Sequence, residues 1–504
     1  MRRYATALLL AAAIAAGPAH AQAPGGTLRV AINNDPDLLD PTLSRTFVGT
    51  AVLSGLCDKL FDFDEHLMIV PRLATGFDWT DPTTLLLHLR TGVTFHDGTP
   101  FDAAAVKYNL DRHMTLPGSF RRAELAAMDR VEVVDPATVR VILKRPASPF
   151  IATLTDRSGM MVSPKAAEAA GKDFGLRPVC SGPFRFVERV AQDHITLERY
   201  PGYWDASRIH LDRVTYRAMT DSSVRLANLR AGSVDMADIV PADVEGVQAD
   251  ARLQLLSSPG LGYAGITLNV GNGAGAAGPL GRDARIRRAF ALSLDPGVLT
   301  QVVFNGQYAP NAQPVSAVSP LHDPATVPPA RDLARARALL AEAGAALPVP
   351  VPLTIANNPQ AVQVAEIIQS MAAEAGFAVQ VNAMDFGASL AATQRGDYAA
   401  YLGGWSGLLD ADSNSWSFLH TGGPLNIAGY SNPEVDTLLD QARVETATEA
   451  RRVLYARVWR QEAADLPIVY LYTPRYIMGA SRRVEGYRVL PDGLIRLQDV
   501  ALRP

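Results

Sequence analysis

The chain has 504 residues, which is too long for a single hydrophobic core and predicts two or three domains. Hydrophobic residues make up 48% of it and charged residues 19%, as in an ordinary globular protein. The formal net charge of −4 leaves no basic excess for binding phosphate backbones, so nucleic acid is not an expected partner.

The N-terminus has the pattern of a secretory signal peptide. Two arginines at 2–3 precede an apolar run at 5–16, and AHA at 19–21 fits the small-x-small rule for cleavage. We therefore expect residues 1–21 to be removed, and the loss of the two arginines takes the net charge from −4 to −6. No later stretch reaches the ~20 apolar residues that a membrane span needs. A soluble, exported protein of the periplasm is predicted.

The chain has two cysteines, Cys57 and Cys180. The first lies far beyond the cleavage site, so no thiol is available for lipid attachment at a mature N-terminus, and a free protein is expected instead of a lipoprotein. In an oxidising compartment the two cysteines predict one disulfide, with two buried thiols as the alternative.

Strand-like and helix-like segments alternate along the chain. Strands are indicated by apolar alternation or by short apolar runs at 27–35, from 84, at 131–146 (a hairpin turning at Asp135-Pro136), 180–204 (a pair), 261–270, from 351, at 377–384 and at 466–472. Helices are indicated by apolar residues at helical spacing or by capping signals at 48–64, 103–114, 221–231, 283–294, 331–344, 361–375, 432–443 and 446–463. This alternation is typical of α/β or α+β layers.

A glycine- and alanine-rich run follows the predicted strand at 261–270. Gly273, Gly275 and Gly278 spell G-x-G-x-x-G before a helix, which is the pattern of a dinucleotide site. The run lies in mid-chain without a clear strand–helix–strand unit, and exported proteins seldom meet dinucleotides. A flexible connection between domains is the better interpretation.

The segment 401–414 (YLGGWSGLLDADSN) sets Trp405 on a glycine-rich loop and then places Asp410 and Asp412 before a helix. Glycine allows turns that residues with a Cβ resist, so Trp405 is well placed to wall a pocket. The alternative is that Trp405 fills the core and that Asp412 or Ser413 caps the helix. The segment alone leaves both interpretations open.

The catalytic patterns of a secreted hydrolase are missing. GWSGL at 404–408 ends in leucine and so misses G-x-S-x-G, there is no H-E-x-x-H, and the nine histidines show no metal-ligand pair four residues apart. Asp410 and Asp412 do not make a glycosidase without evidence of opposed placement. His420 lies near the pocket segment and is a candidate metal ligand or a surface hydrogen-bonding residue. We expect neither enzymatic activity nor a cofactor.

Several segments in order resemble the peptide/nickel-binding family of extracellular solute-binding proteins, family five. The most specific is 84–112, where R-x-G-V-x-F-H-D-G links a strand to a helix. The others are CSGPFRFVE, RDARIRRAFALSLD, DLARARALLAEAG, GGWSGLLDADSN and GYSNPEVDTLLDQAR, which together span almost the whole mature chain.

The resemblance implies an α/β protein with the two-lobed periplasmic-binding-protein fold, type II and cluster C-like. Its first lobe would be discontinuous and would carry an extra inserted subdomain. The implied boundaries are 24–58, 178–268 and 476–504 for lobe I, 59–177 for the inserted subdomain and 269–475 for lobe II. The glycine-rich run at 271–278 would then lie where the chain crosses between the lobes.

The resemblance also implies a function. The protein would capture a di- or oligopeptide between its lobes and deliver it to an inner-membrane ABC permease with cytoplasmic ATPase subunits, acting as a monomer. In peptide receptors of this family an aspartate after G-W-x-G pairs with the ligand's ammonium group, and Asp410 matches it best, followed by Asp412. Tyr263 resembles a pocket-lining aromatic residue of the family, although a core role is the alternative. The implied ligand-binding residues are Ser44, Thr46, Tyr263, Trp405, Asp410 and Asp412.

One departure from the dipeptide receptors concerns the ligand's carboxylate. Their clamping arginine at the start of one helix has no counterpart, because 360–364 contain no arginine. Longer peptides, glutathione, an opine, another small solute or a nickel-type metal chelate therefore stay open as ligands, and a secreted hydrolase is the remaining alternative function.

Overall fold

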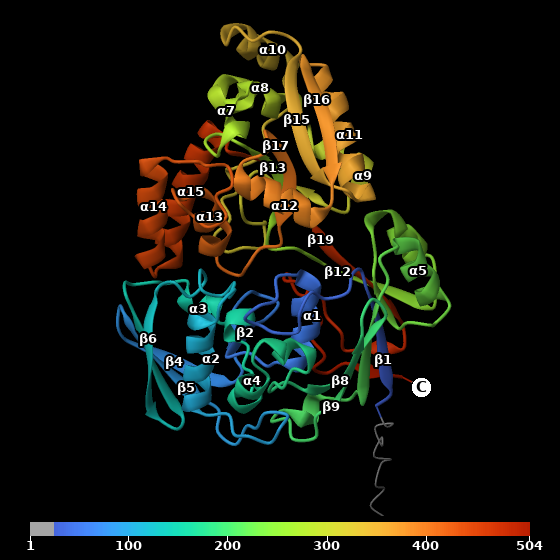
Figure 1. Ribbon diagram of the computed structural model, residues 1–504. Coiled ribbons are helices and arrows are strands. Elements are labelled where there is room, and N and C mark those ends of the chain that lie inside the picture. The colour runs from blue at the N-terminus through green and yellow to red at the C-terminus, as the bar shows by residue number, and fades with distance from the viewer. Residues whose placement is uncertain (1–24, 504) are drawn as a thin grey trace, which may run out of the picture.

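The computed structural model describes residues 25–503, so the signal peptide predicted at 1–21 lies outside the described residues. The chain forms two lobes, one above the other in Figure 1, and crosses between them twice. No helix in the described part of the chain is both long and apolar enough to span a membrane.

The first lobe is built on a seven-stranded sheet in the order β12-β19-β11-β1-β10-β9-β8. β1 lies near its middle and pairs in parallel with β10 and β11. Successive residues of β1 face opposite sides: Val30 packs in a buried cluster with residues of α1, and Ala31 in a second cluster with residues of α5. The elements are β1 (Thr27–Ile32), β8 (Phe184–Val190), β9 (His194–Arg199), β10 (Arg213–Ala218), β11 (Met236–Asp238), β12 (Leu253–Pro259), β19 (Arg475–Ser481), α1 (Phe47–Leu56), α5 (Ser222–Arg230) and α6 (Val244–Gln248), with the short ladder β20 (Val484–Glu485) and β21 (Ala501–Leu502).

The inserted subdomain has its own four-stranded antiparallel sheet, β4-β5-β7-β6, with α2 packed against β6 and β7. Asp102 caps α2 by accepting a hydrogen bond from the backbone of Ala105 at 2.9 Å. The hairpin predicted at 131–146 is confirmed as β6 and β7. The elements are β2 (Phe61–Phe63), β3 (Ile69–Pro71), β4 (Ala74–Asp81), β5 (Thr84–Leu89), β6 (Met128–Asp135), β7 (Thr138–Leu143), α2 (Ala103–Thr115) and α3 (Phe150–Thr153). The next helix, α4 (Pro164–Ala170), packs through Ala167 in the core of the first lobe.

Cys57 and Cys180 are joined in a disulfide, with their Cα atoms 4.8 Å apart. Cys57 takes an extended backbone that ends α1 at Leu56, so the helix predicted over 48–64 is wrong in its second half, which contains β2 instead. The predicted subdomain boundary at 177 is also too late, because Val162 and Phe174 pack in the core of the first lobe.

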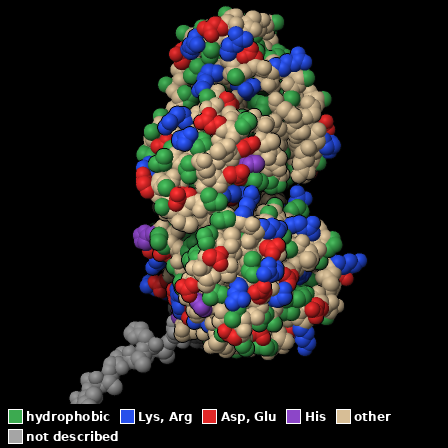
Figure 2. All heavy atoms as spheres, turned by 90° about the vertical axis from the view of Figure 1, so that its left-hand side faces the viewer, with side chains coloured by type: hydrophobic (Ala, Val, Ile, Leu, Met, Phe, Trp, Pro, Cys, Tyr) green, Lys and Arg blue, Asp and Glu red, His purple; other side chains and the backbone are tan. Residues whose placement is uncertain are grey.

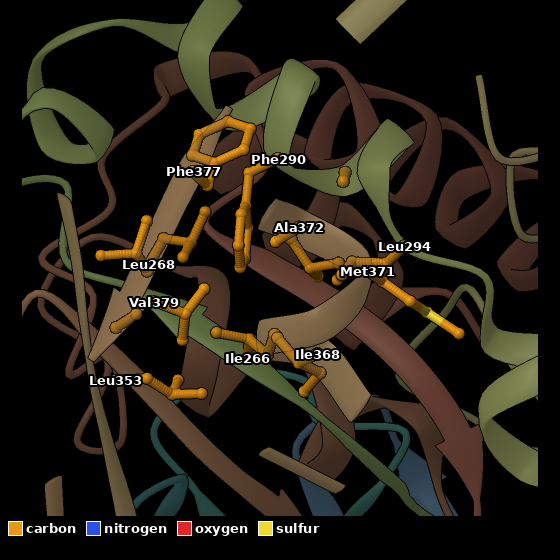
Figure 3. Packing of buried hydrophobic residues seen from close by; sticks show 14 of the residues in the cluster. Ile266, Leu268, Phe290, Leu294, Leu353, Ile368, Met371, Ala372, Phe377 and Val379 are labelled. Atoms are coloured by element: carbon orange, nitrogen blue, oxygen red, sulfur yellow. The ribbon is translucent and has the colours of Figure 1, made fainter. Parts of the chain in front are cut away.

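The second lobe is built on a six-stranded sheet in the order β14-β18-β13-β17-β15-β16. Its core packs α8 and α11 against this sheet, with Phe290 set edge-on to Phe377 at 5.3 Å between ring centroids (Figure 3). The elements are β13 (Tyr263–Leu268), β14 (Ala309–Pro310), β15 (Val349–Ala356), β16 (Phe377–Met384), β17 (Ala400–Trp405), β18 (Ile468–Thr473), α7 (Pro279–Arg282), α8 (Ala284–Ser293), α9 (Pro296–Phe304), α10 (Leu333–Glu342), α11 (Pro359–Ala373), α12 (Phe386–Arg395), α13 (Ala411–Leu419), α14 (Pro433–Val444) and α15 (Thr448–Asp465).

The first crossing between the lobes lies at 260–262, between β12 and β13, and the predicted boundary at 268 is therefore wrong. β13 pairs with β17 and β18 of the second sheet. The second crossing is at Pro474, and the two crossings lie side by side, because the backbone N–H of Gly260 donates to the carbonyl oxygen of Pro474 at 2.8 Å. Two short segments held together in this way form the connection about which the lobes can move.

The glycine-rich run at 271–278 is not this connection, so that prediction is wrong as well. It packs inside the second lobe, where the backbone N–H of Gly275 donates to the carbonyl oxygen of Gly396 at 3.1 Å. A Cβ at Gly275 would lie 1.8 Å from the carbonyl oxygen of Tyr398. Glycine is needed there for close packing, not for flexibility.

Candidate functional site

A cavity lies where the two lobes meet. The first lobe and its subdomain contribute wall residues from the segments 45–50, 152–157 and 492–494. The second lobe contributes residues from the segment 405–413, and the connection between the lobes contributes Leu261. Figure 2 shows the two lobes meeting at a waist, with charges of both signs scattered over the visible face. A solute held in this cavity touches both lobes at once.

The lobes also touch directly. The backbone N–H of Ser148 in the subdomain donates to the carbonyl oxygen of Arg443 at the end of α14, at 2.8 Å. The cavity measures about 90 Å³, below the roughly 300–1,000 Å³ of typical ligand pockets. A ligand the size of a tripeptide therefore requires the lobes to move apart.

Trp405 ends β17 and forms part of the cavity wall, half-buried. Its indole N–H donates to Asn414 Oδ1 at 2.8 Å, and its ring meets Phe418 edge-on with centroids 5.3 Å apart. The same Asn414 oxygen accepts from the backbone of Leu408 at 2.8 Å. The indole is thus fixed from behind, and the loop that follows is tied to the helix beneath it.

A close backbone approach holds this loop against the connection between the lobes. Gly407 has φ +83°, and a Cβ there would lie 2.4 Å from the backbone nitrogen of Gly262. A Cβ at Gly262 would in turn lie 1.9 Å from the carbonyl oxygen of Trp405. The glycine pattern noted in the sequence therefore serves both a left-handed turn and a contact that side chains would block.

Asp410 reaches the cavity wall, but its carboxylate already has a partner. Its Oδ1 accepts from the backbone of Asp412 at 2.9 Å, which caps α13. Both oxygens also accept from the guanidinium of Arg451 on α15, at 2.6 and 2.7 Å. The charge available to a ligand's ammonium is thus offset by Arg451.

Asp412 does not line the cavity. It is buried and receives two hydrogen bonds from Arg443, at 2.7 and 2.9 Å. Burial raises the pKa of Asp412, against the opposing effect of Arg443. The guanidinium of Arg443 also lies over the ring of Trp416, 3.7 Å from its centroid. The pair joins α13 to α14.

Three further predicted residues support the wall from behind. Tyr263 is buried in the core beside Tyr470 and Phe418, as its alternative interpretation had it. Ser44 and Thr46 both donate to Asp37 Oδ1, at 3.0 and 2.7 Å, and Thr46 caps α1. Their hydroxyl groups shape the loop, and it is Arg45 between them that lines the cavity.

His420 does not line the cavity either. Its Nδ1 lies 2.7 Å from the carbonyl oxygen of Thr421, and its ring stacks on Trp416 with centroids 4.4 Å apart. Within residues 25–503 no group of three or more histidine, cysteine or acidic side chains is placed to hold a metal ion. The geometry suits the hydrogen-bonding role.

The inserted subdomain supplies cavity residues that the sequence patterns missed. Asp156 and Arg157 lie next to each other on the wall, and Glu124 lines the same cavity. Burial alone would raise the pKa of Asp156, but Arg157 and Arg121 outweigh it and hold the pKa below its ordinary value. Nothing in the segment 150–160 marks these residues by motif, because their position depends on how the subdomain sits against the second lobe.

The chain matches the family model described as bacterial extracellular solute-binding proteins, family 5 middle, over residues 68–426. The glutathione-binding protein GsiB of Pectobacterium atrosepticum is 31% identical over 517 residues, covering 99% of this chain and 98% of that protein. GsiB of Salmonella typhimurium is 30% identical and covers 99% of both chains.

Solved structures show the same fold. The periplasmic binding protein DppA from Helicobacter pylori, in complex with the peptide STSA, has a TM-score of 0.85 at 24% identity and covers 95% of this chain and 99% of that one. AgaA from A. tumefaciens, in complex with agropinic acid, has a TM-score of 0.83 at 23% identity and covers 95% of this chain and 99% of that one. The two-lobed α/β fold is confirmed, and the protein belongs to the bacterial extracellular solute-binding proteins of family 5.

Proposed function

We propose that this chain is the periplasmic receptor of an ABC importer and that it holds a peptide between its lobes, with glutathione as the first candidate. The observation that carries the proposal is the cavity at the lobe junction, which both lobes line. A ligand that makes more contacts in the closed than in the open arrangement shifts the population toward closure by that difference in affinity. An inner-membrane permease would recognise the closed form, and the receptor would break or form no covalent bond.

The relatives support a ligand of the peptide class. GsiB, similar to this chain over nearly its whole length, is named for binding glutathione, which is a modified tripeptide. DppA, similar in fold, was solved with a peptide. Trp405 and Asp410 stand on the cavity wall and are the ligand-contacting residues in this proposal. Tyr263 and Asp412 would support the second-lobe part of the wall without direct contact with the ligand. Ser44 and Thr46 would do the same for the first-lobe loop that carries Arg45.

Isothermal titration calorimetry tests the proposal. The protein is first unfolded and dialysed to remove any bound ligand, and is then refolded. The probes are reduced glutathione, trialanine and a nickel–histidine chelate. We expect binding of glutathione or trialanine that weakens in Trp405→Ala. Trp79→Ala is the matched control, because Trp79 lies 38% exposed on β4 of the subdomain, away from the cavity wall. Binding of the nickel chelate but of neither peptide would contradict the proposal. So would an equal loss of peptide affinity in Trp405→Ala and Trp79→Ala.

A further inference from the structure

Every carboxylate on the cavity wall has an arginine partner. Asp410 contacts Arg451 at 2.6 Å, and Asp492 contacts Arg496 at 2.7 Å. The remaining wall acids are paired within the subdomain. They are Glu124 with Arg121 at 2.6 Å and Asp156 with Arg157 at 3.6 Å. The acidic side of the wall is therefore already neutralised.

Arg45 breaks this pattern. It lines the same cavity and is exposed, and among the described residues no carboxylate lies within 4.0 Å of its guanidinium. Its charged group lies over the ring of Phe120, 4.6 Å from the centroid. An aromatic face supports a guanidinium but does not occupy its N–H donors.

The backbone beneath Arg45 is fixed by hydrogen bonds, whereas its guanidinium makes no ion pair among the described residues. Its own N–H donates to Asp37 Oδ2 at 2.7 Å, and the hydroxyl groups of Ser44 and Thr46 donate to the other oxygen of Asp37. Burial alone would raise the pKa of Asp37, but these bonds hold it below its ordinary value, so the carboxylate stays charged. Asp37 thus organises the loop, and the guanidinium of Arg45 donates no hydrogen bond to an acceptor within residues 25–503.

We propose that Arg45 receives the C-terminal carboxylate of the bound peptide and that the cavity thereby selects ligands with a free C-terminal carboxylate. This inference rests on the proposed function. A guanidinium offers two parallel N–H donors that match the two oxygens of a carboxylate, and enclosure between the lobes removes competing water. Each carboxylate of the wall is paired with an arginine, whereas Arg45 has no carboxylate of its own within 4.0 Å among the described residues, and a peptide carboxylate would supply one.

The test compares ligands that differ only in this group: glutathione and trialanine, each as the free acid and as the C-terminal amide. Calorimetry measures the acid-to-amide affinity ratio for the natural protein, for Arg45→Ala and for Arg213→Ala. Arg213 is an exposed arginine at the start of β10 that makes no ion pair within the described residues and does not line the cavity. Thermal unfolding of each variant confirms that it folds.

We expect the natural protein and Arg213→Ala to prefer the acid by about 10- to 100-fold, the range of a charge-assisted hydrogen bond. Arg45→Ala should bind acid and amide alike. An undiminished acid preference in Arg45→Ala, or equal binding of acid and amide by the natural protein, overturns the role of Arg45 while leaving the peptide receptor intact. Failure of the natural protein to bind any of the four probes overturns the proposed function itself, and the role of Arg45 with it.

Discussion

Asp410 and Arg451 lie face to face beside the cavity and share two hydrogen bonds of 2.6 and 2.7 Å between carboxylate and guanidinium. Both side chains are largely buried, at 11% and 9% exposure. Arg451 also donates to the carbonyl oxygen of Ala442 in α14. The pair therefore ties the start of α13 to α14 and α15, and it makes Asp410 a structural residue as well as a wall residue.

Asp410→Asn should lower the free energy of unfolding by about 3–5 kcal/mol, because it leaves the Arg451 guanidinium buried without its counter-charge. Urea denaturation measures the loss. Asp397→Asn is the control, because it makes the same change in an exposed ion pair. The side chains of Asp397 and its partner Arg395 are 55% and 62% exposed. This substitution should cost less than about 1 kcal/mol. Equal shifts in the two variants would show that burial does not govern the Asp410 pair.

Gly407→Ala should cost more stability than Gly422→Ala, although both glycines have positive φ, +83° and +72°. At Gly422 a Cβ meets nothing within 4 Å, so only the backbone strain of about 1–2 kcal/mol applies. At Gly407 the Cβ lies 2.4 Å from the backbone of Gly262 and must displace it. We expect the larger loss of melting temperature, and weaker ligand binding, only in Gly407→Ala. Matching melting temperatures would contradict the close contact at 262.

Glu462→Gln should raise stability at neutral pH. Glu462 is 1% exposed, and its Oε1 has no hydrogen-bond partner among the described residues. Burial raises the pKa of this carboxyl group well above its ordinary value. The folded protein thus keeps a proton that the unfolded chain releases above about pH 4.5. The contribution of this retained proton to the free energy of unfolding is complete below about pH 4.5 and is lost as the pH rises through the raised pKa of Glu462.

Glutamine imitates the protonated form, so the variant should gain about 1–3 kcal/mol at pH 7, and the gain should vanish below pH 4.5. Urea unfolding at pH 4 and pH 7 measures it. Glu366→Gln, an exposed change on α11 in the same lobe, is the control and should show no such pH dependence. A gain that is the same at both pH values would mean that Glu462 does not titrate as argued.

Removing the disulfide with Cys57→Ala and Cys180→Ala should lower the free energy of unfolding by about 2–5 kcal/mol. The bond spans 123 residues and encloses the whole inserted subdomain, so its loss frees a long loop in the unfolded chain. Dithiothreitol should lower the urea midpoint of the natural protein to that of the double variant and leave the variant unchanged. If dithiothreitol also lowered the urea midpoint of the double variant, the reductant would be acting on something other than this disulfide.

Local patterns predicted the local structure well. The helix predicted at 103–114 is confirmed as α2, and the 131–146 hairpin turns where Asp135-Pro136 indicated. A cap of α13 was expected at Asp412 or Ser413, and the structure places it at Asp410, close by in the sequence. Each of these depends on residues only a few positions apart, where side-chain and backbone preferences act directly.

Contacts between distant segments were not predictable in this way. The strand at 263–268 has the same apolar pattern whichever sheet it joins, so the crossing at 260–262 appeared only with its pairing to β17 and β18. Likewise, nothing near Asp410 reveals Arg451, 41 residues further along the chain. The loop at 44–46 was identified, but which of its side chains faces the cavity depends on hydrogen bonds to Asp37.

Native mass spectrometry of the protein, purified from the periplasm without unfolding, tests whether the two lobes enclose a peptide. Denaturing release then identifies the bound molecule. We expect a mass of the peptide class, either glutathione or a set of short peptides, at one per chain. This mass should be lost when mild denaturant opens the lobes. A discrete metal chelate or a solute without a peptide bond in the same preparation would contradict it.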